Sequence, residues 1–354
     1  MSLDDPRYQR QMDPQDMYAD IHALPDQLQQ GWTHGQALPL PANGPLRAVI
    51  LAGMGGSAIA GDLLVGYGQN ELAVPVVVWR DYGLPGWAQG DGILVVASSH
   101  SGNTEETLSA AQEARHRGCR VLALTRGGRL ATWAQEHDAL LWRFEHQGQP
   151  RAAVGLTFGL LLSLFTRLGL LNNPETEIQE AIDTLQRQRE ALAFEVPTSQ
   201  NPAKQWAEQL MGHWVTIFGA EYLAPVARRW KGQINELAKA WAQFEVLPEA
   251  DHNTLAGLEQ PPALRRAFRA LFLDAAGLHP RNRLRVQHTR AIFAAQGLHT
   301  AAIMARGSRR LAQQWSLLQM GDYVAYYLAL AYGVDPTPVP AIAQLKQALA
   351  RERS

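Results

Sequence analysis

Short apolar runs alternate with helical segments over residues 46–145, and the same alternation returns from residue 214 onward. These runs lie at residues 47–52, 74–79, 93–97, 120–125, 214–219, 244–247, 268–273 and 300–304. They are rich in Val and Ile without polar alternation, which is typical of parallel strands covered by helices on both faces. The pattern predicts an α/β protein with two doubly wound parallel sheets, the second half being a weak copy of the first.

Helical periodicity fills the spaces between these runs and continues across a turn-rich break at residues 197–202. The predicted helices span residues 108–115, 156–195 with an interruption at 172–174, 221–241, 309–332 and 341–351. The predicted organisation is an N-terminal domain (1–155), a helical connector (156–200), a C-terminal domain (201–333) and a C-terminal extended segment with a final helix (334–354).

One strand-to-helix turn, at residues 97–107, carries an unusual density of hydroxyl groups. Its hydroxyl side chains are Ser98, Ser99, Ser101, Thr104 and Thr107. Free N–H groups and the helix dipole attract anions at a helix start, and added hydroxyls would complete a cup for a phosphate monoester. The turn has no lysine, so it differs from the loop that grips nucleoside triphosphates. We expect a small phosphorylated metabolite; ordinary helix capping by Ser and Thr is the simpler alternative.

The first turn of the chain's α/β pattern, Gly53–Ala58, fits the spacing G-x-G-x-x-A. That spacing also occurs in nicotinamide-dependent dehydrogenases, where a residue such as Asp81 would contact a ribose. The amides of Gly55 and Gly56 and the hydroxyl of Ser57 would serve equally well as walls for a sugar. Both alternatives therefore remain open at this turn.

Composition narrows the possible partners and compartments. The chain has 354 residues and a net charge of -1, so its charge gives no reason to expect nucleic acid or an anionic membrane as a partner. Its single cysteine excludes an internal disulfide. The N-terminus is polar and acidic, unlike a signal peptide, and the most apolar stretch, 154–171, is interrupted by Gly and Arg. A single cysteine fits a reducing compartment, so we predict a cytoplasmic protein. Because Cys and His do not cluster at ligand spacing, we expect no metal, and we predict no cofactor.

Several motifs together resemble those of sugar isomerase (SIS) domain proteins. The superfamily landmarks are Gly53–Ser57, Ser99–Thr107 and Thr125–Ala131. Motifs in the second half resemble the bifunctional phosphoglucose/phosphomannose isomerase family more specifically. They are Lys231–Lys239, Pro248–Asn253, Met320–Tyr323 and Gly333–Asp335 with its following proline. The resemblance covers nearly the whole chain and implies two SIS-type domains.

The family resemblance implies an aldose–ketose isomerase that acts on glucose 6-phosphate, fructose 6-phosphate and mannose 6-phosphate through a cis-enediolate. Glu236 matches the family's base, which carries a proton between C1 and C2. A carboxylate suits this task because partial burial can raise its pKa. His252 matches the ring-opening histidine, which in this family comes from the partner subunit, so a homodimer is implied.

Two further cations match family positions. Lys346 resembles the C-terminal lysine that assists ring opening, and Arg151 resembles the arginine that stabilises the enediolate oxygen. For Glu236, Arg151 and Lys346, an ordinary place on an exposed surface is the alternative. The resemblance also implies a set of groups that bind the phosphate and the sugar: Gly55, Gly56, Ser57, Ser99, Ser101 and Thr104.

The phosphate turn departs from the family pattern at one position. His100 stands where relatives carry an aromatic residue such as tyrosine, although its neighbours Ser99 and Ser101 are retained. We expect the cup to survive this change with altered packing. Two other functions stay open: a non-catalytic sensor of a sugar phosphate, and an isomerase for a different sugar phosphate.

Overall fold

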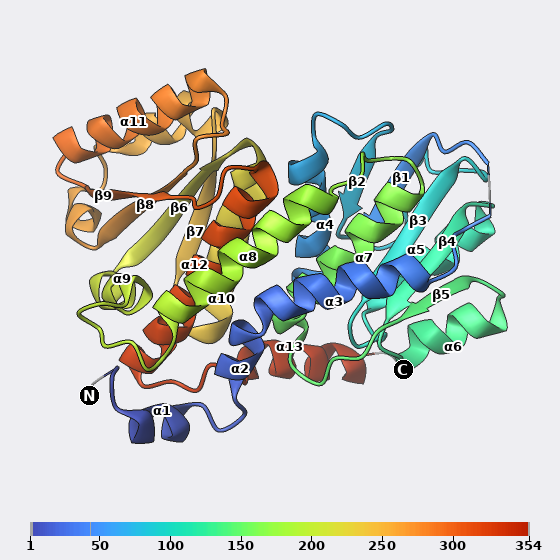
Figure 1. Cartoon of the computed structure of the whole chain (residues 1–354), viewed down its shortest axis with the longest axis horizontal. Coiled ribbons are helices and arrows are strands. Elements are labelled where there is room, and N and C mark those ends of the chain that lie inside the picture. The colour runs from blue at the N-terminus through green and yellow to red at the C-terminus, as the bar shows by residue number, and fades with distance from the viewer. Residues whose placement is uncertain (1–2, 43, 353–354) are drawn as a thin grey trace.

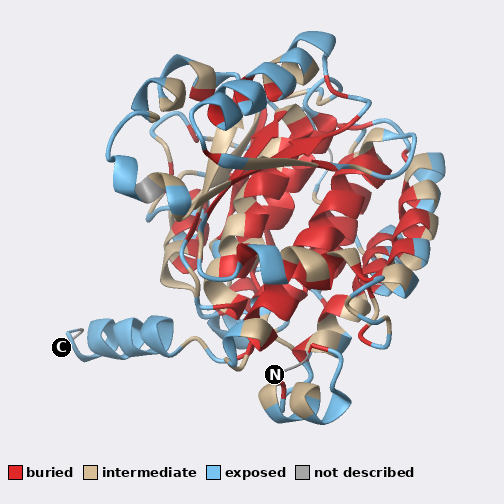
Figure 2. Ribbon diagram, turned by 90° about the vertical axis from the view of Figure 1, so that its left-hand side faces the viewer, coloured by how far each residue is buried: buried red, intermediate tan, exposed pale blue. Residues whose placement is uncertain are grey.

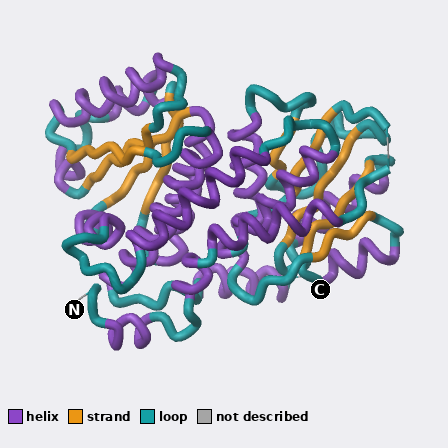
Figure 3. The backbone as a smooth tube through the Cα atoms, in the orientation of Figure 1, coloured by secondary structure: helices purple, strands orange, loops and turns teal. Residues whose placement is uncertain are grey.

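A computed structural model describes residues 3–42 and 44–352 as two parallel sheets separated by a layer of helices (Figures 1 and 3). The first sheet has the order β2-β1-β3-β4-β5 and the second the order β7-β6-β8-β9, with every pairing parallel. The order β2-β1-β3-β4 in one half corresponds to β7-β6-β8-β9 in the other. The predicted α/β class with two parallel sheets is confirmed.

Every predicted strand is present, with ends that differ from the prediction by at most two residues. The strands are β1 (Ala48–Ala52), β2 (Val76–Trp79), β3 (Ile93–Ser99), β4 (Arg120–Thr125), β5 (Leu140–Arg143), β6 (Trp214–Ala220), β7 (Ala242–Leu247), β8 (Phe268–Asp274) and β9 (His299–Met304). Strand β5 was not predicted. It is four residues long and half-buried at the sheet edge, so its sequence lacks the long apolar run that identifies the central strands.

The helices fall into a layer between the sheets and an outer set (Figure 1). The helices between the sheets are α3 (Leu24–Ala37), α4 (Gly55–Gly68), α7 (Val154–Arg167), α8 (Glu175–Leu192), α10 (Ala224–Leu237) and α12 (Arg310–Tyr332). The others are α1 (Pro6–Met12), α2 (Met17–His22), α5 (Glu105–His116), α6 (Gly128–Glu136), α9 (Pro202–Leu210), α11 (Pro280–Ala295), α13 (Pro340–Arg351) and short 3-10 turns that include η1 (Pro150–Ala152) and η3 (Glu249–His252). The predicted domain limits at residues 1 and 354 lie outside the described residues, and the internal limits stay predictions.

The apolar stretch at 154–171 forms the buried helix α7, which lies against α3. Glycines on both helices allow this contact. A Cβ atom at Gly159 would lie 2.5 Å from the Trp32 nitrogen, and one at Gly31 would lie 2.2 Å from the Leu156 carbonyl oxygen. Glycine is therefore required where the two backbones approach. Across the described residues, none of the helices combines the length and the apolar character needed to cross a bilayer.

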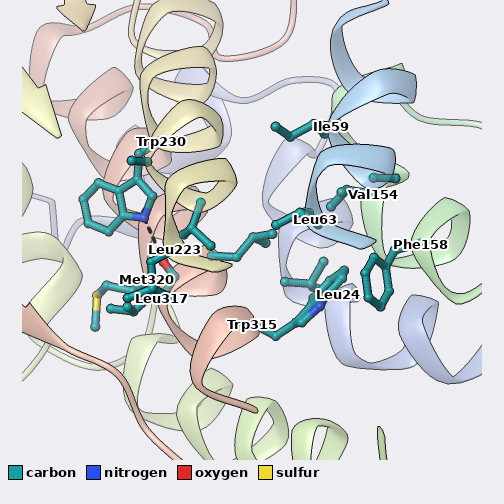
Figure 4. Close-up of a cluster of buried hydrophobic side chains, with 14 of the residues drawn as sticks. Leu24, Ile59, Leu63, Val154, Phe158, Leu223, Trp230, Trp315, Leu317 and Met320 are labelled. Atoms are coloured by element: carbon teal, nitrogen blue, oxygen red, sulfur yellow. Dashed lines mark hydrogen bonds between the residues drawn. The ribbon is translucent and has the colours of Figure 1, made fainter. Parts of the chain in front are cut away.

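Helix α12 runs through the middle of the molecule and is buried on all sides (Figure 2). Trp315 packs edge-on against Phe158 of α7 with ring centroids 4.8 Å apart, and the Trp230 indole N–H of α10 donates to the Leu317 carbonyl at 2.8 Å (Figure 4). These contacts join helices from both halves of the chain. One hydrophobic core consequently extends from the first sheet to the second.

Helix α13 contrasts with α12 because each of its residues is exposed, and it extends away from the body (Figure 2). Ile342, Leu345 and Leu349 lie on one side at helical spacing and are 43%, 60% and 49% exposed. The connector before this helix is held more firmly. Arg151 donates hydrogen bonds to the carbonyls of two residues in it, Pro336 and Thr337.

Candidate active site

A cleft of about 330 Å³ lies where the carboxyl ends of the first sheet's strands meet helix α10. Its wall contains residues from the start of α4, the segment after β2, η1, α10 and β7. The lining residues are Gly55, Gly56, Ile59, Arg80, Arg151, Arg228, Arg229, Lys231, Gly232, Gln233, Glu236 and Phe244. Four of the residues predicted from sequence therefore meet in this cleft: Gly55, Gly56, Arg151 and Glu236.

The carboxylate of Glu236 and the guanidinium of Arg151 face each other in the cleft. The Glu236 Oε2 atom lies 3.6 Å from Arg151 Nη1, and the Glu236 side chain is 31% exposed. Arg151 is only 4% exposed, so it is not the surface arginine of the simpler alternative. Burial lowers the pKa of Arg151, and the opposed Glu236 charge acts in the other direction. The pair offers a partly accessible base beside a fixed positive charge.

Gly56 brings the start of α4 against the segment that carries Arg151. A Cβ atom at Gly56 would lie 2.7 Å from the Pro150 carbonyl oxygen and 2.8 Å from the Arg151 nitrogen. A larger residue would push η1 away from α4 and displace the Arg151 side chain. The Gly-Gly-Ser turn thus has a packing role in addition to the sugar contact expected from sequence.

A second, buried ion pair lies behind Arg151. Arg229 of α10 bonds to both carboxylate oxygens of Asp322 of α12, at 3.0 and 2.7 Å, and both side chains are 3% exposed. The Arg229 Nη2 atom also donates to the Arg151 carbonyl at 2.9 Å. This network fixes the backbone beneath the cleft. Sequence reasoning missed the role of both residues, although Asp322 lies in a motif that it had marked.

The hydroxyl-rich turn is held by bonds among its own side chains. Ser99 Oγ lies 2.9 Å from Thr104 Oγ1 and accepts from the Gly102 amide at 3.1 Å. The His100 amide donates to Ser57 Oγ at 3.1 Å, which joins this turn to the first one. Thr104 occupies the N-cap position of α5 without a side-chain capping bond. Ordinary capping therefore does not account for Thr104, one of the hydroxyls considered from sequence.

The turn hydroxyls adjoin the cleft without lining it. Ser57 directly follows Gly56 and is half-buried, Ser99 is buried, and Ser101 is exposed with its Oγ accepting from the Asn103 amide at 3.2 Å. Because both turns follow neighbouring strands, β1 and β3, their free donors face the same edge of the sheet.

His100 is packed into a buried histidine pair. Its Nε2 lies 3.1 Å from Nδ1 of His146, and Nε2 of His146 lies 3.8 Å from an Asp20 carboxylate oxygen. Burial, together with the charges of His146 and Arg126, lowers the pKa of His100 to about 4. A neutral imidazole fills this place at neutral pH, so the turn gains no positive charge from His100 and depends on neutral donors.

Two residues predicted to act with Glu236 lie outside the cleft. His252, at the end of η3, is exposed, and its neighbour Asp251 is held by Arg285 and Thr289 of α11 at 2.8 and 2.7 Å. Lys346 is exposed on α13, which projects from the body. The structure thus brings together Glu236 and Arg151 but not His252 or Lys346.

Sequence reasoning also overlooked a lysine close to the pair. Lys239 has a φ of 53°, and its ammonium donates to the carbonyls of Leu237, at 3.0 Å, and Asp335. Burial and the Arg151 charge lower the pKa of Lys239 to about 8. Lys239 and Arg151 together hold the connector that leads to α13. The sequence signal that could have identified Lys239 was its position three residues after Glu236.

Two parallel α/β units that share a cleft beside a hydroxyl-rich turn define a protein of the SIS class. The family model "Bacterial phospho-glucose isomerase C-terminal SIS domain" matches residues 199–349. The fold is similar to a crystal structure of a glucose-6-phosphate isomerase like protein from Thermus thermophilus, with a TM-score of 0.64 and 20% identity over 96% of this chain and 98% of that one.

Sequence relatives identify the family within this class. A bifunctional phosphoglucose/phosphomannose isomerase from Caldicellulosiruptor bescii is 38% identical over 94% of this chain and 99% of its own length. Another from Aquifex aeolicus is 33% identical over 86% of this chain and 91% of its own length. The chain belongs to the bifunctional phosphoglucose/phosphomannose isomerase family.

Proposed function

We propose that this protein interconverts glucose 6-phosphate and fructose 6-phosphate, and also accepts mannose 6-phosphate. The observation that carries the proposal is the Glu236 carboxylate, held 3.6 Å from the buried Arg151 guanidinium in a cleft beside the hydroxyl-rich turns. An aldose–ketose isomerase needs one base and one fixed charge at this place. The names of the two relatives support the same substrates.

In the proposed mechanism, the phosphate binds the donors of the two turns: Gly55, Gly56, Ser57, Ser99, Ser101 and Thr104. The open-chain sugar then extends into the cleft toward Glu236. The Glu236 carboxylate removes the proton from C2 of the aldose, the C1–C2 double bond forms, and negative charge develops on O1. Arg151 stabilises this oxygen. Glu236 returns the proton to C1, and the proton of the O2 hydroxyl passes to O1. C2 thereby becomes the ketose carbonyl and O1 becomes a hydroxyl.

Ring opening requires an acid and a base in addition to Glu236. We assign this step to His252 of the partner subunit, assisted by Lys346, in a homodimer. The exposure of both residues in one protomer supports assembly of the site between subunits, and the apolar side of α13 offers surface for it. This arrangement needs no metal, nucleic acid or membrane, and we place the enzyme in the cytoplasm, where a single unpaired cysteine stays reduced.

The homodimer predicts complementation between two inactive variants. Glu236→Gln and His252→Asn would each inactivate every site of their own homodimer. In a mixed dimer, one site receives both substitutions and the other receives neither. Random exchange in an equimolar mixture should therefore restore about a quarter of the wild-type activity, since half of the dimers are mixed and each has one intact site.

Activity of the mixture is measured after subunit exchange in mild denaturant, with each variant alone carried through the same treatment. A mixture as inactive as its two components would show that His252 acts within its own subunit. A fully active His252→Asn variant would show that His252 takes no part in the reaction. Light scattering of the purified protein gives the subunit number independently.

A coupled assay on fructose 6-phosphate in the presence of EDTA tests the function, with glucose 6-phosphate and mannose 6-phosphate detected separately. Formation of both products is expected. Binding of fructose 6-phosphate without either product would favour the sensor, or an isomerase for another sugar phosphate. Tight binding of NAD in the same preparation would favour the dehydrogenase alternative.

A further inference from the structure

The cleft contains more positive charge than the proposed isomerisation uses. Arg151 faces Glu236, and Arg229 is paired with Asp322. Three further cations line the same cleft: Arg80, Arg228 and Lys231.

One carboxylate pairs with two of these three cations. Asp62 contacts Arg80 Nη2 and lies 3.4 Å from Arg228 Nη1. Within the described part of the chain, Lys231 forms no salt bridge. Three positive charges against one negative charge leave two uncompensated, which equals the charge of one phosphate group.

The partly exposed position of these side chains suits ligand binding. Arg228 is 42% exposed, and its guanidinium carbon lies 5.1 Å from the centre of the Phe244 ring, which also lines the cleft. A stacked, partly hydrated guanidinium can turn toward an anion without a large desolvation cost. Arg229, by contrast, is buried and already bonded to both oxygens of its carboxylate.

Sheet topology gives the separation between this cluster and the phosphate turn. Arg80 follows β2 and the hydroxyl-rich turn follows β3, with β1 between them. Neighbouring strands are separated by about 4.8 Å, so the ends of β2 and β3 lie roughly 10 Å apart. A six-carbon sugar with an anionic group at each end can span such a separation.

We propose that the cleft binds sugars with two anionic ends, hexose bisphosphates above all, with the second phosphate held by Arg80, Arg228 and Lys231. The inference rests on the proposed function in one respect: the first phosphate occupies the hydroxyl-rich turns. A bisphosphate then competes with the monophosphate substrate for one cleft and regulates the enzyme through the concentration of a doubly phosphorylated sugar.

Calorimetric titration at low ionic strength tests the proposal, with fructose 1,6-bisphosphate and fructose 6-phosphate as probes. We expect the bisphosphate to bind at least about tenfold more tightly than the monophosphate, and this ratio to fall as salt is added. Lys231→Gln and Arg228→Gln should each bring the ratio of the two affinities toward one. Arg290→Gln, which removes the same charge from an exposed position on α11, should leave the ratio unchanged.

Three results would overturn the proposal. The first is a wild-type ratio near one. The second is an equal loss of affinity for the bisphosphate and the monophosphate in the Lys231 and Arg228 variants, which would make these cations part of the monophosphate site. The third is a high ratio that the variants do not change. Binding is measured without turnover. A protein without isomerase activity would contradict the proposed function, whereas the ratio of the two binding affinities would still test this inference.

Discussion

Replacing Glu236 with glutamine should lower kcat for fructose 6-phosphate by about 10²- to 10⁴-fold, the usual contribution of a positioned base. The amide cannot accept the C1 proton of this ketose, so the enediolate does not form. The size and polarity of the side chain are nearly kept, and the phosphate is held by separate turns. The dissociation constant of the substrate should therefore change by less than about threefold, because the lost interaction acts in the transition state.

Turnover is followed in the coupled assay and binding by calorimetry on the same protein. Glu208→Gln provides the matched control, because Glu208 is exposed on α9 outside the cleft. It should retain the wild-type kcat. If Glu236→Gln turned over at a rate close to that of Glu208→Gln, Glu236 would not be the base that transfers the proton.

Replacing Asp322 with alanine should lower the free energy of unfolding by about 3–5 kcal/mol, the range measured when one partner of a buried ion pair is removed. Arg229 would remain buried beneath the cleft without its carboxylate. Because Arg229 also donates to the Arg151 carbonyl, the loss should reach the site through the backbone that carries Arg151. Asp322 is in this sense a positioning residue.

Urea unfolding followed by circular dichroism gives the stability change. Asp26→Ala is the matched control: Asp26 lies 2.6 Å from Arg189, but its side chain is 60% exposed, so the expected loss is at most about 1 kcal/mol. The double variant Asp322→Leu with Arg229→Met should recover part of the loss, because it leaves no buried charge unpaired. Equal losses for Asp322→Ala and Asp26→Ala would contradict the structural role.

The site residues that could be found from the sequence are those that belong to one continuous motif. The hydroxyl-rich turn is continuous from Ser98 to Thr107, and the Gly55–Ser57 turn directly follows a strand, so both were found by inspection. Arg80 and Arg228 have no such signal, because they enter the cleft from segments that adjoin only after both sheets are formed. Arg80 could have been found from its place just after a parallel strand.

The sequence by itself determined the two parallel sheets, the ends of every strand except β5 to within two residues, some of the helices, and the two turns beside the cleft. The strands and turns show in short motifs and a hydrophobic period that can be read along the chain. Their parallel arrangement follows from apolar runs without polar alternation that are joined by helices. Only the tertiary structure decided that α12 lies buried between both halves, that Asp322 pairs with Arg229, and that Glu236 faces Arg151 while His252 and Lys346 lie elsewhere. Those contacts join residues far apart in the sequence, and packing of the two sheets around shared helices selects them.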